Sequence, residues 1–253
     1  AASDVYKRQD FTYAMSSAQQ YEWLENEHPD LFERMKKRIK EGRFIPVGGM
    51  WVESDVMMLC GESLIRQMTF GKHYFKEHLG VEPHGIWLPD SFGYTGALPQ
   101  LARRAGFDWF LTQKISWNDT TKFPHHSFLW EGIDGSRILA HFPPSNTYAS
   151  AVSMHELVYS QRNFLDKDLS DHAILLYGFG DGGGGPTREM TARIRRDCNL
   201  EGAPRVDFGT PDELFEKIRK DIVDDSNGDT PVFKGELYLE LHRKTLTSQQ
   251  DMK

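Results

Sequence analysis

The chain has 253 residues, of which 39% are hydrophobic and 26% charged, so it can bury a sizeable core like an ordinary globular protein. Thirty Lys and Arg residues stand against 37 Asp and Glu residues, for a formal net charge of −7 at pH 7 and no basic cluster. This balance argues against nucleic acid or an anionic membrane as the main partner. There is no run of about 18 apolar residues, so we expect no membrane span.

The first residues are treated apart from the fold. Residues 1–9 (AASDVYKRQ) have neither helical nor strand periodicity and resemble a translated sequencing adapter. We therefore interpret 1–9 as non-native and 10–253 as one partial α/β domain cut from a longer chain.

Strand and helix patterns alternate along the rest of the chain. The first half predicts, in order, a strand at 11–15, helices at 18–27 and 30–41 separated by Pro29, a strand at 43–47, a helix at 62–79 ended by Gly80, a strand at 84–88, a helix at 98–105 and a strand at 109–112. The second half predicts strands at 128–130 and 138–142 joined by an Asp134-Gly135 turn, a helix at 154–165, a strand at 173–177, a helix at 187–198, a strand at 206–208, a helix at 211–222 and a strand at 232–241. This alternation indicates a parallel sheet with crossover helices, either a barrel or a doubly wound sheet.

Polar residues follow four of the predicted strands. They are the GGMWVESD segment at 48–55, Asp90, the GFGDGGGG segment at 178–185, and His242. In parallel α/β folds the chemistry lies at the carboxyl ends of the strands. The sequence therefore predicts one functional site where these four segments meet.

Asp90 is the strongest single candidate. An aspartate after a strand is often a helix N-cap, but here the next helix begins several residues later, near Ala97. Trp87, Phe92 and Tyr94 surround it with aromatic surface of the kind that stacks on sugar rings. We expect Asp90 to be a catalytic carboxylate of a carbohydrate-processing enzyme.

Other candidates are less distinctive. Asp181 lies at the centre of a glycine-rich turn that suits close backbone approach to a bulky neutral ligand better than it suits a phosphate. His242 shares the polar face of its predicted strand with Glu236 and Glu240, so it is either a structural histidine or a metal ligand. The sequence also suggests contacts of Asp55 and Asp119 with sugar hydroxyl groups, and leaves Trp51 open between core packing and a pocket wall.

The chain has two cysteines, Cys60 and Cys198, without zinc-ribbon spacing. We expect two buried, unpaired thiols and a reducing, cytoplasmic location.

Five motifs occur in the order found in glycoside hydrolase family 38. They are GGMWVESD at 48–55, WLPDSFGY at 87–94, TQKISWND at 112–119, GDGGGGPT at 180–187 and GELYLELHR at 235–243. The chain from Phe11 onward resembles the bacterial and cytosolic or vacuolar α-mannosidases of this family.

The resemblance implies a seven-stranded β/α barrel, incomplete at its N-terminus, of a retaining, zinc-dependent α-mannosidase that hydrolyses terminal α-mannosidic linkages of oligosaccharides or N-glycans. It assigns Asp90 as nucleophile and zinc ligand, His242 as a second zinc ligand, and Asp181 as the acid/base. Trp51, Asp55, Tyr94, Asp119 and Glu236 are the expected substrate-binding residues. A mannose-containing oligosaccharide is the expected partner, and the longer parent protein could form a homo-oligomer.

One departure concerns the metal. The other two zinc ligands of the family form a His-x-Asp pair on the first strand, and no such pair precedes Phe11. Because a catalytic zinc normally has three protein ligands, we expect the chain by itself to bind zinc weakly and to be inactive. Two alternatives stay open, namely a metal-dependent polysaccharide deacetylase, although no His-x-x-x-His pair is present, and a carbohydrate-binding barrel without catalysis.

Overall fold

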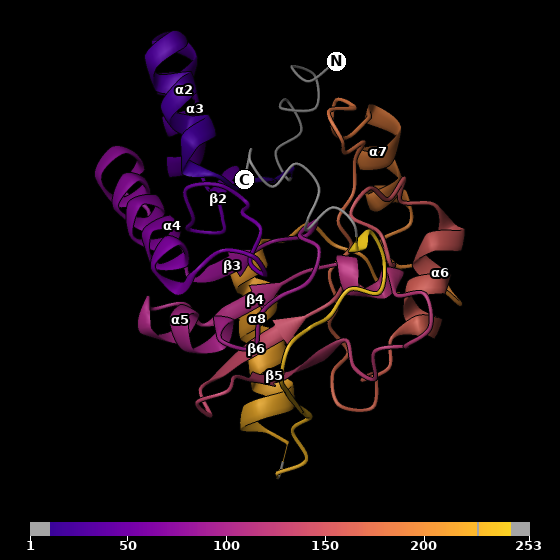
Figure 1. The fold of residues 1–253 in the computed structure, drawn as a ribbon. Coiled ribbons are helices and arrows are strands. Elements are labelled where there is room, and N and C mark those ends of the chain that lie inside the picture. The colour runs from indigo at the N-terminus through magenta and orange to yellow at the C-terminus, as the bar shows by residue number, and fades with distance from the viewer. Residues whose placement is uncertain (1–10, 227, 244–253) are drawn as a thin grey trace.

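The computed structural model describes residues 11–226 and 228–243, which form seven strands in two sheets (Figure 1). The larger sheet has the strand order β3 (Gly85–Trp87), β4 (Trp109–Leu111), β6 (Arg137–His141), β5 (Ser127–Glu131), β7 (Val232–Lys234). The smaller sheet pairs β1 (Tyr13–Met15) with β2 (Phe44–Pro46). Strands β3, β4 and β6 are parallel, whereas β5 runs antiparallel to β6 and parallel to β7. The α/β class is confirmed. The described strands do not form one continuous seven-stranded sheet, so the closed barrel stays a prediction.

The predicted helices are all present within a few residues of their expected bounds. They are α2 (Ala18–Glu27), α3 (Pro29–Lys40), α4 (Gly61–Tyr74) continued by the π-helical turn η1 (Phe75–Leu79), α5 (Leu98–Arg104), α6 (Met154–Asn163), α7 (Arg188–Arg196), and α8 (Pro211–Arg219) continued by η3 (Lys220–Asp224). A short 3₁₀ turn, η2 (Lys114–Trp117), follows β4.

Local chemistry explains why these boundaries could be predicted. Thr210 caps α8 by accepting a 3.3 Å hydrogen bond from the Glu213 backbone N–H, and Pro211 occupies the first turn, where its missing N–H has no cost. Pro29 likewise occupies the first position of α3, so it does not lie between the two helices as predicted. Gly80 follows η1 with φ 68°, a left-handed conformation that favours glycine.

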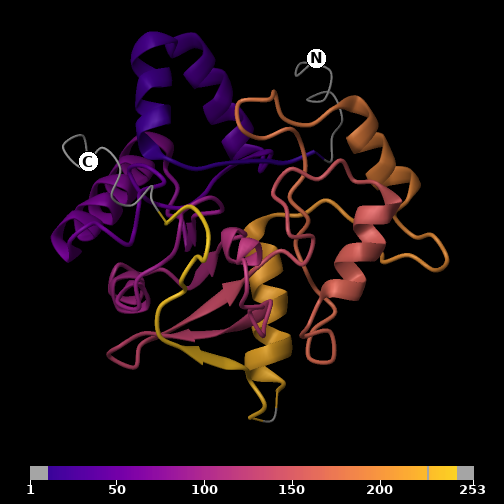
Figure 2. The ribbon, with the colours of Figure 1, turned by 45° about the vertical axis from the view of Figure 1, so that its right-hand side comes forward.

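The larger sheet is covered on both faces, and successive residues of its strands alternate between them. Ile86, Phe110 and Ala140 are register partners and pack into one core, which also takes side chains of α4 and α5. Trp109 and its neighbours on the opposite face pack against Phe215 and other residues of α8. Figures 1 and 2 show α8 lying along this face of the sheet.

Two helical groups flank the sheets. The α2–α3 hairpin packs on α4 and η1 through Tyr21, Phe32 and Phe75. On the other side of the molecule, α6 and α7 pack together through Leu157 and Ile194 (Figure 2). The two groups thus lie on opposite sides of the molecule, whereas α4, α5 and α8 cover the faces of the larger sheet. Among the described residues, none of the helices combines the length and apolar character that a membrane crossing requires.

Several predictions from local pattern were wrong. Residues 173–177 and 206–208 form no strand, apart from an isolated bridge of Tyr177 with Ser150, and the predicted strand 232–241 is limited to β7. Leu175 and Phe208 instead pack as irregular chain against α6 and α7. Apolar character favours burial but cannot supply the neighbouring strand that a ladder needs. The two cysteines are free as expected, but both are exposed instead of buried.

Candidate active site

Asp90 lies in the turn that follows β3, as predicted, and its backbone surroundings are tightly fixed. The β3–β4 pairing extends one residue past β3, because the Leu88 N–H donates to the Leu111 carbonyl at 3.1 Å. Tyr94 is completely buried beneath the turn, and its hydroxyl lies 2.8 Å from the Leu88 carbonyl, 2.9 Å from the Ser91 carbonyl and against Thr112 Oγ1. Tyr94 therefore holds the Asp90 turn from the interior, where it does not face a substrate directly.

Lys114 is the main electrostatic partner of Asp90. Its Nζ atom forms an ion pair with Asp90 Oδ1, and only 3% of the lysine side chain is exposed, against 46% of the Asp90 side chain. The same Nζ lies 3.6 Å from the centre of the Trp117 ring and 5.3 Å from that of Phe92. A lysine enclosed in this way is costly without an anion, so Asp90 and the aromatic rings together stabilise its charge.

Tyr148 joins the two predicted catalytic carboxylates. Its hydroxyl lies 3.4 Å from Asp90 Oδ1 and 3.4 Å from Asp181 Oδ1, so these oxygens are no more than twice that distance apart. Both contacts are longer than an ordinary O–H···O hydrogen bond, and the single phenolic proton can serve only one of them at a time. Burial, and then the charges of Asp90 and Asp181, raises the pKa of Tyr148 to about 12, so the hydroxyl stays protonated near neutral pH.

The glycine-rich loop presents Asp181 at the surface. Phe179 and Gly185 exchange two backbone hydrogen bonds of 2.9 Å, which close a small loop around residues 180–184. Asp181 has φ 51°, and a side chain at Gly178 would lie 2.8 Å from the Pro186 nitrogen. The glycines thus permit a turn so tight that the Asp181 carboxylate projects toward Tyr148.

Glu53 is a further carboxylate near Asp90, and although it stands in the GGMWVESD segment, it was not singled out from the sequence. The residue as a whole is exposed, but neighbouring atoms crowd its carboxyl group, and this burial raises its pKa. A hydrogen bond from Ser16 opposes that effect, and the nearby charge of Asp90 adds to it. Its loop is attached to the Asp90 turn by the hydrogen bond from Ser91 Oγ to the Ser54 carbonyl, 3.0 Å long.

His242 is brought to the same region by a segment that runs beside the Asp90 turn. Tyr94 and Leu237 exchange two backbone hydrogen bonds of 2.9 Å, and the His242 ring lies 4.9 Å from the Phe92 ring. The alternation predicted for this segment is confirmed, since Leu237 and Leu239 are buried while Tyr238 and His242 are exposed.

A zinc ion would need more donors than this region supplies. Within residues 11–226 and 228–243, no three His, Cys, Asp or Glu side chains are grouped closely enough to hold a metal. Asp90 is moreover paired with the Lys114 ammonium group, which competes with a cation for the same oxygen. The described residues therefore do not make a complete zinc site.

The other predicted binding residues are engaged locally or exposed. Asp55 Oδ1 accepts backbone hydrogen bonds of 2.8 and 3.1 Å from Met57 and Met58, which makes it a turn residue. Asp119 pairs with Arg243 at 3.5 Å, and Glu236 is exposed. None of these contacts reaches Asp90 or Asp181.

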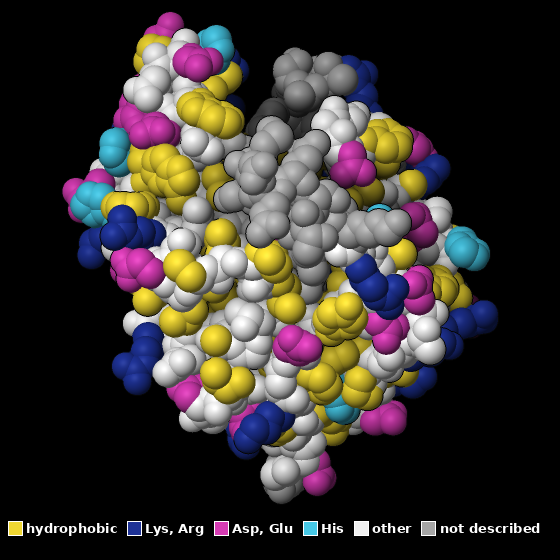
Figure 3. Space-filling view, viewed as in Figure 1, with side chains coloured by type: hydrophobic (Ala, Val, Ile, Leu, Met, Phe, Trp, Pro, Cys, Tyr) yellow, Lys and Arg dark blue, Asp and Glu magenta, His cyan; other side chains and the backbone are white. Residues whose placement is uncertain are grey.

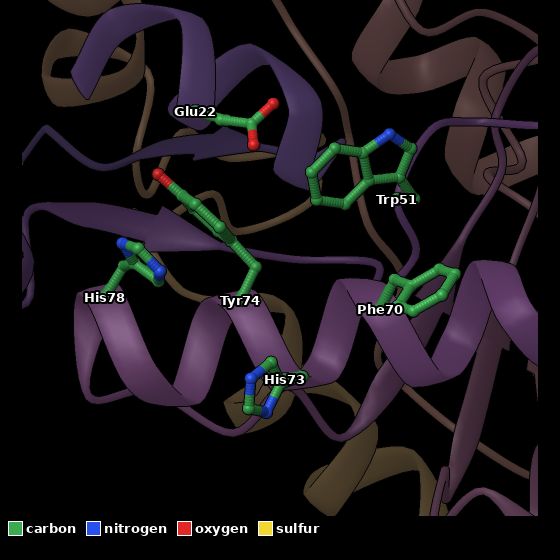
Figure 4. Close-up of a pocket in the computed structure, with 6 residues that line it drawn as sticks. All are labelled: Glu22, Trp51, Phe70, His73, Tyr74 and His78. Atoms are coloured by element: carbon green, nitrogen blue, oxygen red, sulfur yellow. The ribbon is translucent and has the colours of Figure 1, made fainter. Parts of the chain in front are cut away.

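Trp51 lies away from the two carboxylates. Its indole packs between α2 and α4, where it lines a separate pocket with Phe70 and Tyr74 (Figure 4). Of the residues that the structure gathers around Asp90, Lys114, Tyr148 and Glu53 were not selected from the sequence. Lys114 stands in the TQKISWND motif, but nothing in its local pattern distinguishes it from a surface lysine.

The sequence profile of the family described as "Glycosyl hydrolases family 38 N-terminal domain" matches residues 2–236, which is most of the chain. The chain belongs to glycosyl hydrolase family 38. The resemblance drawn from the five ordered motifs is thereby confirmed.

Curated relatives agree with this family. The chain is 43% identical over 244 residues to "Alpha-mannosidase 2C1" of Mus musculus, covering 96% of this chain and 23% of the relative. It is 44% identical over 243 residues to "Alpha-mannosidase G" of Dictyostelium discoideum, covering 96% of this chain and 22% of that protein. The chain thus spans about a quarter of the length of the curated relatives that it matches.

An α-mannosidase from Enterococcus faecalis V583 has a similar structure, with a TM-score of 0.74 and 17% identity over 92% of this chain and 27% of that one. A 4-alpha-glucanotransferase from Thermococcus litoralis follows with a TM-score of 0.57 and 17% identity, covering 84% of this chain and 33% of that one. At these identities the two structures show a shared fold and nothing finer.

Proposed function

We propose that this chain is the nucleophile-bearing part of a retaining α-mannosidase that hydrolyses terminal α-mannosidic linkages of oligosaccharides or N-glycans. The observation that carries the proposal is the convergence of Asp90 and Asp181 on the Tyr148 hydroxyl. Two carboxylates on either side of a glycosidic bond are what its hydrolysis requires, one to act on the anomeric carbon and one on the leaving oxygen.

The spacing favours retention. Retaining enzymes hold their carboxyl groups about 5–5.5 Å apart and inverting enzymes about 6.5–9.5 Å apart, to leave room for a water. Twice the 3.4 Å contact with Tyr148 is the largest separation that the two nearest oxygens can have, and it barely enters the second range. The proposal therefore gives Asp90 the attack on the anomeric carbon and Asp181 the protonation of the leaving oxygen.

In the second half of the reaction, Asp181 would accept a proton from the water that releases mannose from Asp90, so both carboxylates return to their initial states. Lys114 would keep Asp90 ionised and oriented before the attack. Tyr148 would separate the two carboxylates in the empty site and release one of them when a glycosidic oxygen enters between them.

Zinc dependence belongs to this proposal as a property of a longer protein. Asp90 and His242 would contribute two ligands, and further ligands would come from outside the described residues. A bound zinc would supply charge that orients sugar hydroxyl groups. Because the described residues do not complete the site, the chain by itself is proposed to be inactive. Cytoplasmic location, and homo-oligomers of the longer protein, are further parts of the proposal.

The test is an assay of a protein that carries this chain within the full length of its relatives, on a chromogenic α-mannoside. We expect hydrolysis that a chelator abolishes and zinc restores, with α-mannose as the first product seen by NMR. Asp90→Asn and Asp181→Asn should each remove most of the activity, and Asp134→Asn, in the exposed β5–β6 turn, should not. A β-configured first product would overturn the retaining assignment, and full activity of Asp90→Asn would overturn the nucleophile. Absence of hydrolysis in the folded, zinc-loaded protein would favour a carbohydrate-binding barrel.

A further inference from the structure

A second candidate site lies between α2 and α4, on a face to which the proposed catalytic carboxylates do not contribute. It is a pocket of about 220 Å³ that opens to solvent and is lined by Glu22, Trp51, Phe70, His73, Tyr74 and His78 (Figure 4). This volume is below the range of about 300–1,000 Å³ that is usual for drug-sized ligands, so it suits a single small ring.

Aromatic rings form the walls of this pocket. The Trp51 and Tyr74 rings meet edge to face, with centroids 6.1 Å apart and an interplanar angle of 85°. Phe70 is 54% exposed on α4, and Figure 3 shows hydrophobic side chains gathered over this part of the surface beside acidic ones. An exposed aromatic face next to hydrogen-bonding groups is suited to the apolar face of a sugar ring, whose edge carries hydroxyl groups.

The Trp51 backbone and the Tyr74 side chain are held in place by neighbouring elements, so this part of the pocket is preformed. The backbone N–H of Trp51 donates to the Gln67 carbonyl of α4 at 2.9 Å, and the backbone carbonyl of Trp51 accepts from the Gln19 N–H of α2 at 3.0 Å. The Tyr74 hydroxyl donates to Glu25 at 2.7 Å, and the His78 ring stacks on the Tyr74 ring at 4.2 Å. Little conformational freedom would be lost on binding.

Glu22 is a carboxylate of this pocket for which the described residues supply no hydrogen-bond donor. It is half-buried on α2, projects toward the Tyr74 and Trp51 side (Figure 4), and makes no hydrogen bond or ion pair with another described residue. The neighbouring Glu25, by contrast, is satisfied by Tyr74 and His78. A half-buried carboxylate without a donor is suited to a ligand that brings O–H groups.

The pocket is connected to the Asp90 turn through one short loop. Trp51 precedes Ser54 by three residues, a span of at most about 11 Å of extended chain, and Ser54 accepts the hydrogen bond from Ser91. An oligosaccharide of a few units could therefore reach from Asp90 to Trp51.

We propose that this pocket binds one pyranose unit of a mannose-containing oligosaccharide, at a distance from the bond that is cleaved. The ring stacks on Trp51 and Phe70, and its hydroxyl groups donate to Glu22. This inference rests on the proposed function for the identity of the sugar, but the pocket binds its unit independently of catalysis.

The experiment uses the chain itself and two tryptophan reporters. The indole N–H signals of Trp51, in the pocket, and of Trp117, beside Lys114, are assigned in NMR spectra by Trp51→Phe and Trp117→Phe. The chain is then titrated with methyl α-mannoside and with an α-linked mannotriose at millimolar concentration. We expect saturable shifts of the Trp51 signal with both ligands.

Matched variants locate the binding. Phe70→Ala and Glu22→Gln should each weaken the affinity reported by Trp51 about fivefold or more, since each removes a stacking face or the charge of an acceptor. Ile65→Ala on α4 and Trp23→Ala on α2 remove comparably exposed apolar side chains outside the pocket and should leave the affinity unchanged. Three outcomes would each overturn the proposal. They are absence of saturation at Trp51, equal effects of the control variants, and a Trp51 shift caused by the quaternary ammonium ion choline but not by the mannosides.

The result is independent of the proposed reaction. Binding at Trp51 in a full-length, zinc-loaded protein that has an intact Asp90 and no hydrolytic activity would retain the pocket and overturn the proposed function. Hydrolysis without any mannoside-dependent shift of Trp51 would retain the proposed function and overturn the pocket.

Discussion

The Nζ atom of Lys114 lies against Oδ1 of Asp90, and only 3% of the lysine side chain is exposed to solvent. The pair links the first residue of η2 to the turn after β3. Asp90, the proposed nucleophile, is also the anion that permits Lys114 to be buried.

This relationship predicts an unequal effect of the two carboxylates on stability. Asp90→Asn should lower the free energy of unfolding by about 1–2 kcal/mol, because it leaves the Lys114 ammonium without its anion at a site that solvent only partly screens. Asp181→Asn should change it by less than about 0.5 kcal/mol, since Asp181 is exposed. Urea unfolding followed by circular dichroism measures both. Equal effects of the two substitutions would contradict the role of the ion pair.

The shared hydroxyl of Tyr148 leads to a kinetic prediction for the longer protein. Tyr148→Phe keeps the ring but removes the group between Asp90 and Asp181, and should lower kcat about tenfold with little change in KM. Tyr159→Phe is the matched control, because its hydroxyl contacts Asn146 and neither carboxylate. An increase in KM with unchanged kcat would instead place Tyr148 in substrate binding.

The chain should bind zinc weakly. Asp90 and His242 are the proposed ligands among the described residues, and no group of three donors occurs there. Isothermal titration at neutral pH should therefore show no sub-micromolar affinity. Sub-micromolar binding that His242→Gln abolishes would show that a complete site forms in this chain after all.

Two buried histidines predict acid sensitivity. Burial lowers the pKa of His126 to about 4 and that of His141 to about 3, whereas both have values near 6.5 in the unfolded chain. The unfolded state therefore binds more protons below about pH 6.5, and each histidine costs on the order of 2 kcal/mol by about pH 4.5. His141 Nε2 accepts the Ile174 N–H at 3.2 Å, a bond that protonation would break.

Unfolding free energies measured between pH 7 and 4.5 test this expectation. This range includes the ordinary histidine pKa of about 6.5. His141→Gln, which can keep hydrogen bonds to Ser127 and Ile174, should flatten the pH dependence. His155→Gln, at an exposed position of α6, should leave it unchanged. Identical slopes in all three proteins would contradict the prediction.

Two glycines of α4 predict opposite effects of the same substitution. A side chain at Gly71 would lie 2.3 Å from the Met50 carbonyl carbon, so Gly71→Ala should destabilise the chain by about 1–3 kcal/mol and displace the Trp51 loop. Gly61 has no atom within 4 Å of the same position, so Gly61→Ala should stabilise by roughly 0.4–1 kcal/mol. Thermal unfolding measures both, and a neutral Gly71→Ala would show that α4 can move away from the loop.

The sequence alone was enough to predict the family, the helices and the turn that carries Asp90. Caps such as Thr210, breaks such as Pro29 and a five-motif order are local properties, readable without knowledge of what lies nearby. It also indicated Asp181, although the strand expected before it does not form, because a tight glycine turn needs no strand to present its aspartate.

Which side chains meet depends on tertiary packing. Lys114 and Tyr148 contact Asp90, and the charge of Asp90 acts on Glu53. In each case the two residues are more than twenty positions apart, and local periodicity carries no information on such neighbours. The same reason explains why Tyr94 is buried under the site and Trp51 faces a different pocket. Residue type determines the chemistry that a side chain can perform, whereas packing determines which neighbours it contacts.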